Sequence, residues 1–354
     1  MEERTRRRAR IADVAREAGV SKTAVSFAFN SPDRLAPETA TRIRTVADVL
    51  GYRPHPVARM LTQRATHVLG IVTPHRLSTS FSNPFFGAFS EGVALVAEQE
   101  GYALQFISPL EGSLATAMGR ATIDGAVVVG LSAHHPEVEQ LRAAHLPFVM
   151  VDSSALQDLP SVDVDDEGGA RMAAEHLLAL GHRRILVVAM EPLTPGAIRD
   201  FDGVSVRRTR GYAAAFDAAG VDLPEASTVV APVVTEGGTA AMRRAWEDGL
   251  RPTAVLAMSD AMAMGVLRAA REIGLRVPQD LSVVGFDDLD MSQHTNPPLT
   301  TVHQPIRLKG EVAVRMLLAM VERREPRPEQ LRLETRLIIR ESTAPPPRRR
   351  PAVR

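Results

Sequence analysis

The chain of 354 residues is long enough for more than one domain. It contains no Cys, which excludes a disulfide framework and thiolate metal or redox sites. No apolar run approaches the ~18 residues of a membrane-spanning helix, and the start MEERTRRRAR lacks the apolar stretch of a signal peptide. We therefore expect a multidomain globular protein located in the cytoplasm.

The charge of the chain is balanced but unevenly distributed, with 42 basic and 42 acidic side chains. Residues 1–64 hold 13 Arg and Lys against 7 Asp and Glu, and residues 344–354 add 4 Arg and no acid. Residues 65–343 therefore carry 25 basic and 35 acidic side chains, a formal charge of −10. A basic head on an acidic body indicates that the head, and not the body, contacts a polyanion.

Residues 11–51 have the pattern of three short helices. Gly19 ends the first helix, Ser21 is placed to cap the second, and Pro37 opens a third that ends before Gly51. The positions expected to face a common core recur at helical spacing, and they are Ile11, Val14, Ala15, Ala18, Ala24, Val25, Ala28, Ile43, Val46, Ala47 and Leu50. This arrangement predicts a helix-turn-helix unit.

The outer positions of the second helix carry polar groups that can serve recognition. Lys22, Thr23 and Ser26 can exchange hydrogen bonds with base edges and phosphates. Phe27 has two open readings, because an exposed ring there can contact a thymine methyl group or pack back on the third helix.

The segment GYRPHPVARMLTQRAT, residues 51–66, separates the head from the body. Pro54 and Pro56 end the third helix, and residues 57–63 are too few to hold a helix alone in water. The residues allow two readings: a hinge that orders on DNA and wedges the pair Met60 and Leu61 into the minor groove, or a plain linker.

From His67 onward, short apolar strands alternate with helices. The predicted strands are VLGIVTP, YALQFIS, GAVVVG and PFVMVD in a first half, and RILVVAM, STVVAP, AVLAM and LSVVGFDD in a second. Helices are predicted over residues 92–100, 169–180, 210–219 and 262–273. The alternation predicts right-handed βαβ units and parallel sheets in two lobes, with ligand binding at the carboxyl ends of the strands.

Charged side chains collect at these expected carboxyl ends. Carboxylates and guanidinium groups in such a place suit vicinal hydroxyls or a charged group. Any one of them could instead cap a helix or form an interdomain salt bridge, which applies most to Asp260 and Asp288. The residues are Asp152, Arg207, Arg208, Arg210, Asp260, Asp287 and Asp288.

Several motifs in this order resemble the LacI/GalR (lactose/galactose repressor) family of transcription regulators. They are DVAREAGVSKTAVS, the hinge VARML, LGHRRI at residues 180–185, and LSVVGFDD followed by PPLTTVHQP at residues 297–305. The resemblance runs from about residue 11 to residue 342. It implies an N-terminal all-α helix-turn-helix head plus an α/β core of two lobes, with the fold of type I periplasmic binding proteins, parallel sheets and three crossovers.

The resemblance also implies domain limits. We expect a head over residues 1–53, a hinge over 54–65, an effector-binding and dimerisation core over 66–343, and a disordered basic tail over 344–354. Lobe 1 would comprise about residues 66–160 and 303–322, and lobe 2 about residues 161–302 and 323–343.

In function, the resemblance implies a repressor that binds a palindromic operator as a homodimer and responds to a small molecule, without a metal or cofactor. Leu61 corresponds to the leucine that intercalates at the central step, with Ala58 beside it. The candidate DNA-contacting residues are Ser21, Lys22, Thr23, Ser26, Phe27, Asn30, Ala58 and Leu61. The candidate effector-contacting residues are Phe85, Asp152, Arg208, Ser259, Asp287 and Gln304.

Three positions depart from the family pattern. Phe27 stands where many members carry Arg, Ser259 replaces a frequent Asn, and Arg10 stands where a capping Thr is common. Loss of that cap weakens a helix start by about 1 kcal/mol.

The sequence disfavours two other functions. An enzyme is disfavoured because no GxSxG, P-loop, GxGxxG or HExxH motif is present, and a transport solute-binding protein because the export signal is missing. A sugar is the favoured effector, and a nucleobase or nucleoside is the alternative.

Overall fold

The computed structural model describes residues 9–53, 65–153, 159–190, 203–223, 227–322 and 329–347. The chain divides into two compact units, Met1–Thr66 and His67–Arg354. Among the described residues, no helix combines the length and the apolar composition needed to cross a bilayer.

The first unit folds as the three predicted helices with a short 3₁₀ turn between the last two. They are α1 (Ile11–Glu17), α2 (Lys22–Asn30), η1 (Pro32–Arg34) and α3 (Pro37–Leu50). Gly19 and Gly51 both adopt φ +66, the left-handed conformation that ends α1 and α3. The helix-turn-helix fold is confirmed.

The core of this unit differs from the prediction at one position. Val14, Val25 and Ile43 are completely buried, as their spacing predicted. Leu50 is instead 37% exposed, and Tyr52 takes the core position beyond Gly51. The left-handed turn at Gly51 folds the chain back, so the ring of Tyr52 contacts Phe29 edge-on at 5.9 Å.

The second unit contains two sheets, each of six strands. The first sheet has the order β11-β5-β4-β3-β1-β2, and all of its neighbouring strands are parallel. Its strands are β1 (Val68–Val72), β2 (Ala103–Ile107), β3 (Gly125–Val129), β4 (Phe148–Val151), β5 (Ser161–Val164) and β11 (Gln330–Leu333).

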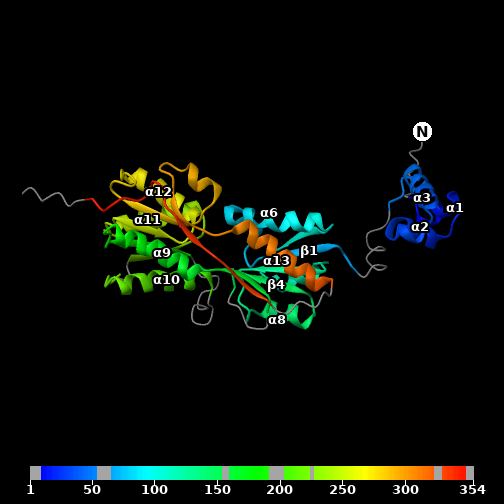
Figure 1. Ribbon diagram of the computed structural model, residues 1–354, viewed down its shortest axis with the longest axis horizontal. Helices are drawn as coiled ribbons and strands as arrows, with labels where there is room; N and C mark the ends of the chain where they lie inside the picture. Colours follow the sequence, from blue (N-terminus) through cyan, green and yellow to red (C-terminus); the bar gives the residue numbers. More distant parts are fainter. Residues whose placement is uncertain are drawn as a thin grey trace, which may run out of the picture. The chain divides into compact units, whose positions relative to one another are not determined.

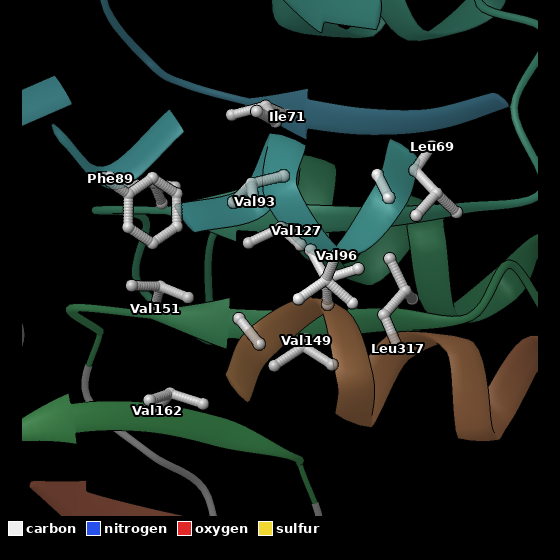
Figure 2. Close-up of a cluster of buried hydrophobic side chains, with 14 of the residues drawn as sticks. Leu69, Ile71, Phe89, Val93, Val96, Val127, Val149, Val151, Val162 and Leu317 are labelled. Carbon is white, nitrogen blue, oxygen red and sulfur yellow. The ribbon is translucent and has the colours of Figure 1, made fainter. Parts of the chain in front are cut away.

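Helices cover both faces of the first sheet (Figure 1). One face packs against α6 (Pro84–Gln99) and α13 (Ile306–Val321), which lie side by side, and the short α5 (Leu77–Ser82) precedes α6. Figure 2 shows Phe89, Val93 and Val96 of α6 facing the valines of the sheet, with Leu317 of α13 beside them. The other face packs against α7 (Leu114–Arg120) and α8 (Pro136–Ala143).

The second sheet has the order β12-β10-β9-β8-β6-β7, with only β12 antiparallel to its neighbour. Its strands are β6 (Ile185–Met190), β7 (Thr228–Ala231), β8 (Ala254–Ala257), β9 (Ser282–Asp287), β10 (Thr300–His303) and β12 (Arg336–Ile338). The helices α9 (Asp166–Ala179) and α10 (Val204–Ala218) cover one face, and α11 (Thr235–Glu247) and α12 (Asp260–Ile273) cover the other (Figure 1). The 3₁₀ helix η4 (Asp290–His294) follows β9.

The chain crosses between the two sheets three times, as the family resemblance implied. The crossings lie between β5 and α9, between β10 and α13, and between β11 and β12, the last seen as the red segment that joins the lobes in Figure 1. The lobe limits differ from those expected, because β5 and β11 both belong to the first sheet. The resemblance placed residues 161–164 and 330–333 in lobe 2, whereas both segments pair within the first sheet.

Ala344, where the expected disordered tail would begin, is bound to the second lobe. Ala344 donates its N–H to Ser282 Oγ at 3.0 Å, and its carbonyl oxygen lies 2.8 Å from Nε2 of the buried His182. The chain up to this residue is therefore bound to the second sheet. Residues 348–354 lie outside the described part.

Candidate DNA-binding surface and effector site

The start of α2 presents polar groups outward. Ser21 Oγ accepts the N–H of Ala24 at 3.0 Å, so Ser21 is the predicted N-cap. Ser21, Lys22 and Thr23 are all exposed, which leaves the lysine ammonium and the threonine hydroxyl on the surface. The geometry suits contact with a groove or with phosphates.

The second turn of α2 carries a linked polar pair. Asn30 Nδ2 donates to Ser26 Oγ at 3.2 Å. The carbonyl oxygen of the Asn30 side chain finds no hydrogen-bond donor within the described residues. This oxygen is buried, so it does not face the solvent at the end of the helix.

Phe27 lies outside the apolar cluster of the head. Its ring is partly exposed, and the guanidinium of Arg34 in η1 lies 5.4 Å from the ring centroid. Arg34 is exposed, so its guanidinium and the ring of Phe27 lie together on the surface of the head. Ala58 and Leu61, the two candidate residues of the hinge, lie outside the described residues.

Four predicted effector residues converge between the two sheets. Asp152 follows β4 and Asp287 ends β9, each at a carboxyl end, and both are buried at positive φ (54 and 127). Gln304 follows β10 and is 2% exposed, and Gln304 Nε2 donates to Asp287 Oδ1 at 2.6 Å. Non-glycine residues with positive φ are uncommon, and such strain clusters at ligand sites.

Lys309 of α13 completes this network and was not predicted. Its ammonium donates to Asp152 Oδ1 at 2.6 Å and to Gln304 Oε1 at 2.7 Å, and it is fully buried. Two signals could have identified it: it is one of only two lysines in the chain, and it occupies the apolar face of its helix.

Arg208 joins the network from α10. Its Nε donates to Asp166 Oδ1 at 2.9 Å, its Nη1 donates to the carbonyl oxygen of Met258, and Nη1 lies 3.9 Å from Asp287 Oδ1. The guanidinium stacks on Phe286, 3.5 Å from the ring centroid. Nε and Nη1 of this buried cation are therefore bonded, and Phe286 covers one face of its guanidinium.

Arg207 forms a second arm of the same cluster. Its Nη2 donates to Asp166 Oδ2 at 2.8 Å and to Asp163 Oδ1 at 3.5 Å, and its Nη1 donates to the carbonyl oxygen of Ser153 at 3.2 Å. Asp163 belongs to the first sheet, Ser153 follows β4 of that sheet, and Arg207 lies in the second lobe. The bonds from Arg207 to Asp163 and to Ser153 therefore cross between the lobes.

The carboxylates differ in protonation because their surroundings differ. Burial raises the pKa of Asp163 to about 6, with the charge of Asp152 adding to the effect, and burial also raises the pKa of Asp287 to about 6. Burial opposes ionisation of Asp166 as well, but the guanidinium groups of Arg208 and Arg207 outweigh it and lower its pKa.

The two remaining candidates lie at the edges of this network. Ser259 Oγ accepts the N–H of Met262 at 3.2 Å and so caps α12. Phe85 opens α6, is partly buried, and lies with its ring centroid 5.3 Å from Lys309 Nζ. The structure therefore connects Phe85 to Asp152 through a cation, whereas Ser259 has a structural bond of its own.

Asp260 and Asp288 are held by structural contacts. Asp260 accepts hydrogen bonds from the N–H of Leu289 and from the hydroxyls of Ser292 and Thr301, at 2.9, 2.5 and 2.5 Å. Asp288 pairs with Arg340 at 2.6 Å and lies 3.0 Å from His303 Nδ1. Neither residue forms the helix cap or the interdomain salt bridge considered from the sequence, and both are held by contacts within the second lobe.

Comparison with known proteins gives two family matches. A model described as bacterial regulatory proteins, lacI family, matches residues 10–55, and one described as a periplasmic binding protein-like domain matches residues 174–343. The HTH-type transcriptional regulator CelR of Thermobifida fusca is 31% identical over 345 residues, which cover 95% of this chain and 99% of CelR. The HTH-type transcriptional repressor PurR of Escherichia coli O1:K1 is 35% identical over 352 residues, 96% of this chain and 98% of PurR.

Solved structures agree over nearly the whole chain. A CelR–cellobiose complex superposes with a TM-score of 0.70 at 30% identity, covering 95% of this chain and all of that one. The lac repressor dimer bound to operator and the anti-inducer ONPF gives a TM-score of 0.80 at 25% identity, covering 96% of this chain and all of that one.

Proposed function

Because this chain belongs to the lacI family of bacterial regulatory proteins, and is thus a DNA-binding transcriptional regulator, we propose that it is an operator-binding repressor controlled by a sugar. It would act in the cytoplasm as a homodimer on a roughly palindromic operator. Two copies of α2 would enter successive major grooves about one helical turn apart.

For DNA contact, the proposal rests on the outer surface of α2. Lys22 and Thr23 would contact base edges or phosphates, and Ser21, Ser26 and Asn30 would position the helix. Phe27 and Arg34 would present a ring and a cation together, a thymine methyl being the natural partner of the ring.

The hinge part of the proposal rests on residues outside the described ones. Leu61, with Ala58 beside it, would wedge into the central minor-groove step, as in the family pattern. Replacing Leu61 with Ala is then expected to weaken binding to operator more than binding to unrelated DNA. Equal losses of affinity for operator and for unrelated DNA would contradict the wedge role of Leu61.

A single observation carries the effector proposal: Asp152, Arg208, Asp287 and Gln304 converge in one buried network between the lobes. Carboxylate oxygens accept hydrogen bonds from hydroxyl groups, which suits a sugar, and the relative CelR has been solved with cellobiose. A sugar that exchanges bonds with this network would change how the lobes meet and so bias the DNA-binding state.

The test uses Arg208→Lys in the full-length protein. Lysine keeps a cation against Asp166 but cannot make the paired contacts of a guanidinium. We expect operator affinity without effector to stay within about twofold and the response to effector to fall at least about tenfold. Arg243→Lys, on the exposed α11 pair with Glu272, is the matched control. An unchanged effector response in Arg208→Lys would exclude Arg208 from the site.

A further inference from the structure

Lys309 is a charged residue in an otherwise apolar setting. It is fully buried, and the neighbouring buried positions of α13 are Ile306, Ala313, Val314 and Leu317. A buried ion pair is often no more stabilising than apolar side chains of similar volume, because both charges lose their hydration. Stability alone therefore does not explain a lysine where methionine would fit.

Within the described residues, the ammonium of Lys309 contacts candidate effector residues. Its ammonium takes one oxygen of Asp152 and the only carbonyl oxygen of the Gln304 side chain, and it faces the ring of Phe85. The amide nitrogen of Gln304 is in turn bound to Asp287. The hydrogen bonds of Lys309 thus determine which side-chain oxygens of Asp152 and Gln304 can still accept hydrogen bonds from a ligand.

The summed formal charge of the ionisable side chains around Lys309 is slightly negative. Three cations, Lys309, Arg207 and Arg208, face four carboxylates, those of Asp152, Asp163, Asp166 and Asp287. A further negative charge placed among these buried groups would meet carboxylates that the three cations do not fully neutralise.

We propose that Lys309 and Asp152 together set the specificity of the effector site: Lys309 is the built-in counter-ion of Asp152, and the one carboxylate that the three cations leave unneutralised restricts the effector to uncharged, hydroxyl-rich molecules and excludes the corresponding acids. This inference rests on the proposed function. The hydroxyls of a neutral sugar donate to the carboxylate oxygens that Lys309 leaves available. A sugar acid brings a further carboxylate, and the three described cations of this network are already paired with Asp152, Asp163, Asp166 and Asp287.

The experiment measures binding of three matched sugar pairs to the full-length protein at pH 7.5 by calorimetry. The pairs are glucose and glucuronate, galactose and galacturonate, and cellobiose and cellobionate. In the wild-type protein, we expect the neutral member of at least one pair to bind at least tenfold tighter than its acid.

Three variants change the charge balance in steps. Asp152→Asn removes one carboxylate and should let the acid bind at least tenfold better relative to the neutral sugar. Lys309→Met removes one cation and should lower the relative affinity of the acid further. The double variant carries both changes and should return the ratio to the wild-type value, and melting curves without ligand show that each variant is folded.

The outcomes separate the inference from the proposed function. An acid that binds the wild-type protein as well as its neutral partner overturns the role of Lys309 and leaves a sugar-controlled repressor intact. A ratio that stays constant across all four proteins has the same consequence, because a merely structural lysine would not move it. If no sugar binds while operator binding persists, the sugar effector and this inference both fail. If Asp152→Asn alone is unfolded, the single variant Lys309→Met and the double variant still provide the comparison.

Discussion

The carboxyl of Asp163 shows how one buried side chain sets a pH dependence. It lies on β5, accepts the N–H of Ser153 at 3.1 Å, and has a pKa raised to about 6, chiefly by burial. Its folded pKa exceeds the ordinary value of 3.8, so the folded protein holds a proton that the unfolded chain has lost. The resulting loss of stability begins near pH 4 and is complete above about pH 6.

Replacing Asp163 with Asn should remove this pH dependence. Asparagine can still accept the N–H of Ser153, but it does not ionise. At about 1.4 kcal/mol per pKa unit, the variant should gain up to about 3 kcal/mol relative to the wild type between pH 4 and pH 7. Urea unfolding followed by the single tryptophan, Trp246, measures it, with the exposed Asp217→Asn as control. Parallel pH profiles of the wild type and the Asp163 variant would contradict the assignment.

A second prediction at this scale concerns Lys22. If its exposed ammonium contacts DNA, Lys22→Ala should weaken operator binding several-fold. The slope of log affinity against log salt concentration should also become shallower by about one, the value for one lost phosphate contact. Arg16→Ala, on α1 and paired with Asp13, is the control. An unchanged salt dependence in Lys22→Ala would remove Lys22 from the phosphate contacts.

Local chemistry explains which residues the sequence could identify. The capping role of Ser21 depends only on its neighbours in the chain, and the structure contains it as predicted. The partner of Asp152 lies 157 positions away at Lys309, so no local pattern could pair the two. Phe27 remained open for the same reason, because its neighbour Arg34 belongs to a different element.

At the scale of elements, α6 and α13 approach so closely that their contact requires glycine. A Cβ on Gly92 would overlap the backbone carbonyl of Arg307, and one on Gly310 would crowd that of Phe89. Backbone cannot move aside as a flexible side chain can. The helices α6 and α13, which cover one face of the first sheet, are thus fixed against one another. This contact also fixes the position of Lys309 on α13.

Two glycines on one helix give a matched test of this contact. Gly92→Ala should destabilise the protein by about 1–3 kcal/mol, the range for overpacking. Gly87→Ala, on the same helix with no atom within 4 Å of its Cβ, should instead stabilise it by up to about 1 kcal/mol. Thermal unfolding followed by circular dichroism distinguishes them. A stabilising Gly92→Ala would mean that the helices are not in such close contact.

Apolar strands and amphipathic helices were predictable, whereas short strands with polar members were not. The eight strands predicted from apolar runs all occur, and α9 and α12 match their predicted ranges closely. The strands β5, β10, β11 and β12 were not predicted, because three or four residues with polar members carry little periodicity. All four strands adjoin the crossovers, and the lobe limits shifted because β5 and β11 belong to the first sheet.

For the whole molecule, the separation of charge predicts two different responses to salt. Operator binding should weaken at least about tenfold between 50 and 200 mM salt, because phosphate contacts release counterions. Effector binding should change little over the same range, since the groups that would contact it are buried and poorly screened. Titrations of both ligands on one preparation measure this, and a salt-insensitive operator affinity would argue against phosphate contact by the basic head.

The order of motifs along the chain was enough to predict the overall architecture. Two lobes with three crossovers follow from the family pattern, and the two sheets confirm them. The details that connect the lobes, such as the bond from Arg207 to Asp163, depend on side-chain geometry between segments distant in sequence. Those bonds could be found only in the folded structure.

The central claim, a sequence-specific repressor controlled by a small molecule, is tested most directly by selection of genomic DNA fragments. The full-length protein would select fragments at physiological salt, with and without an extract of small cellular molecules. We predict enrichment of a palindrome whose half-sites lie about one helical turn apart, and a change in that enrichment when the extract is added. Absence of any enriched sequence in both conditions would contradict the account.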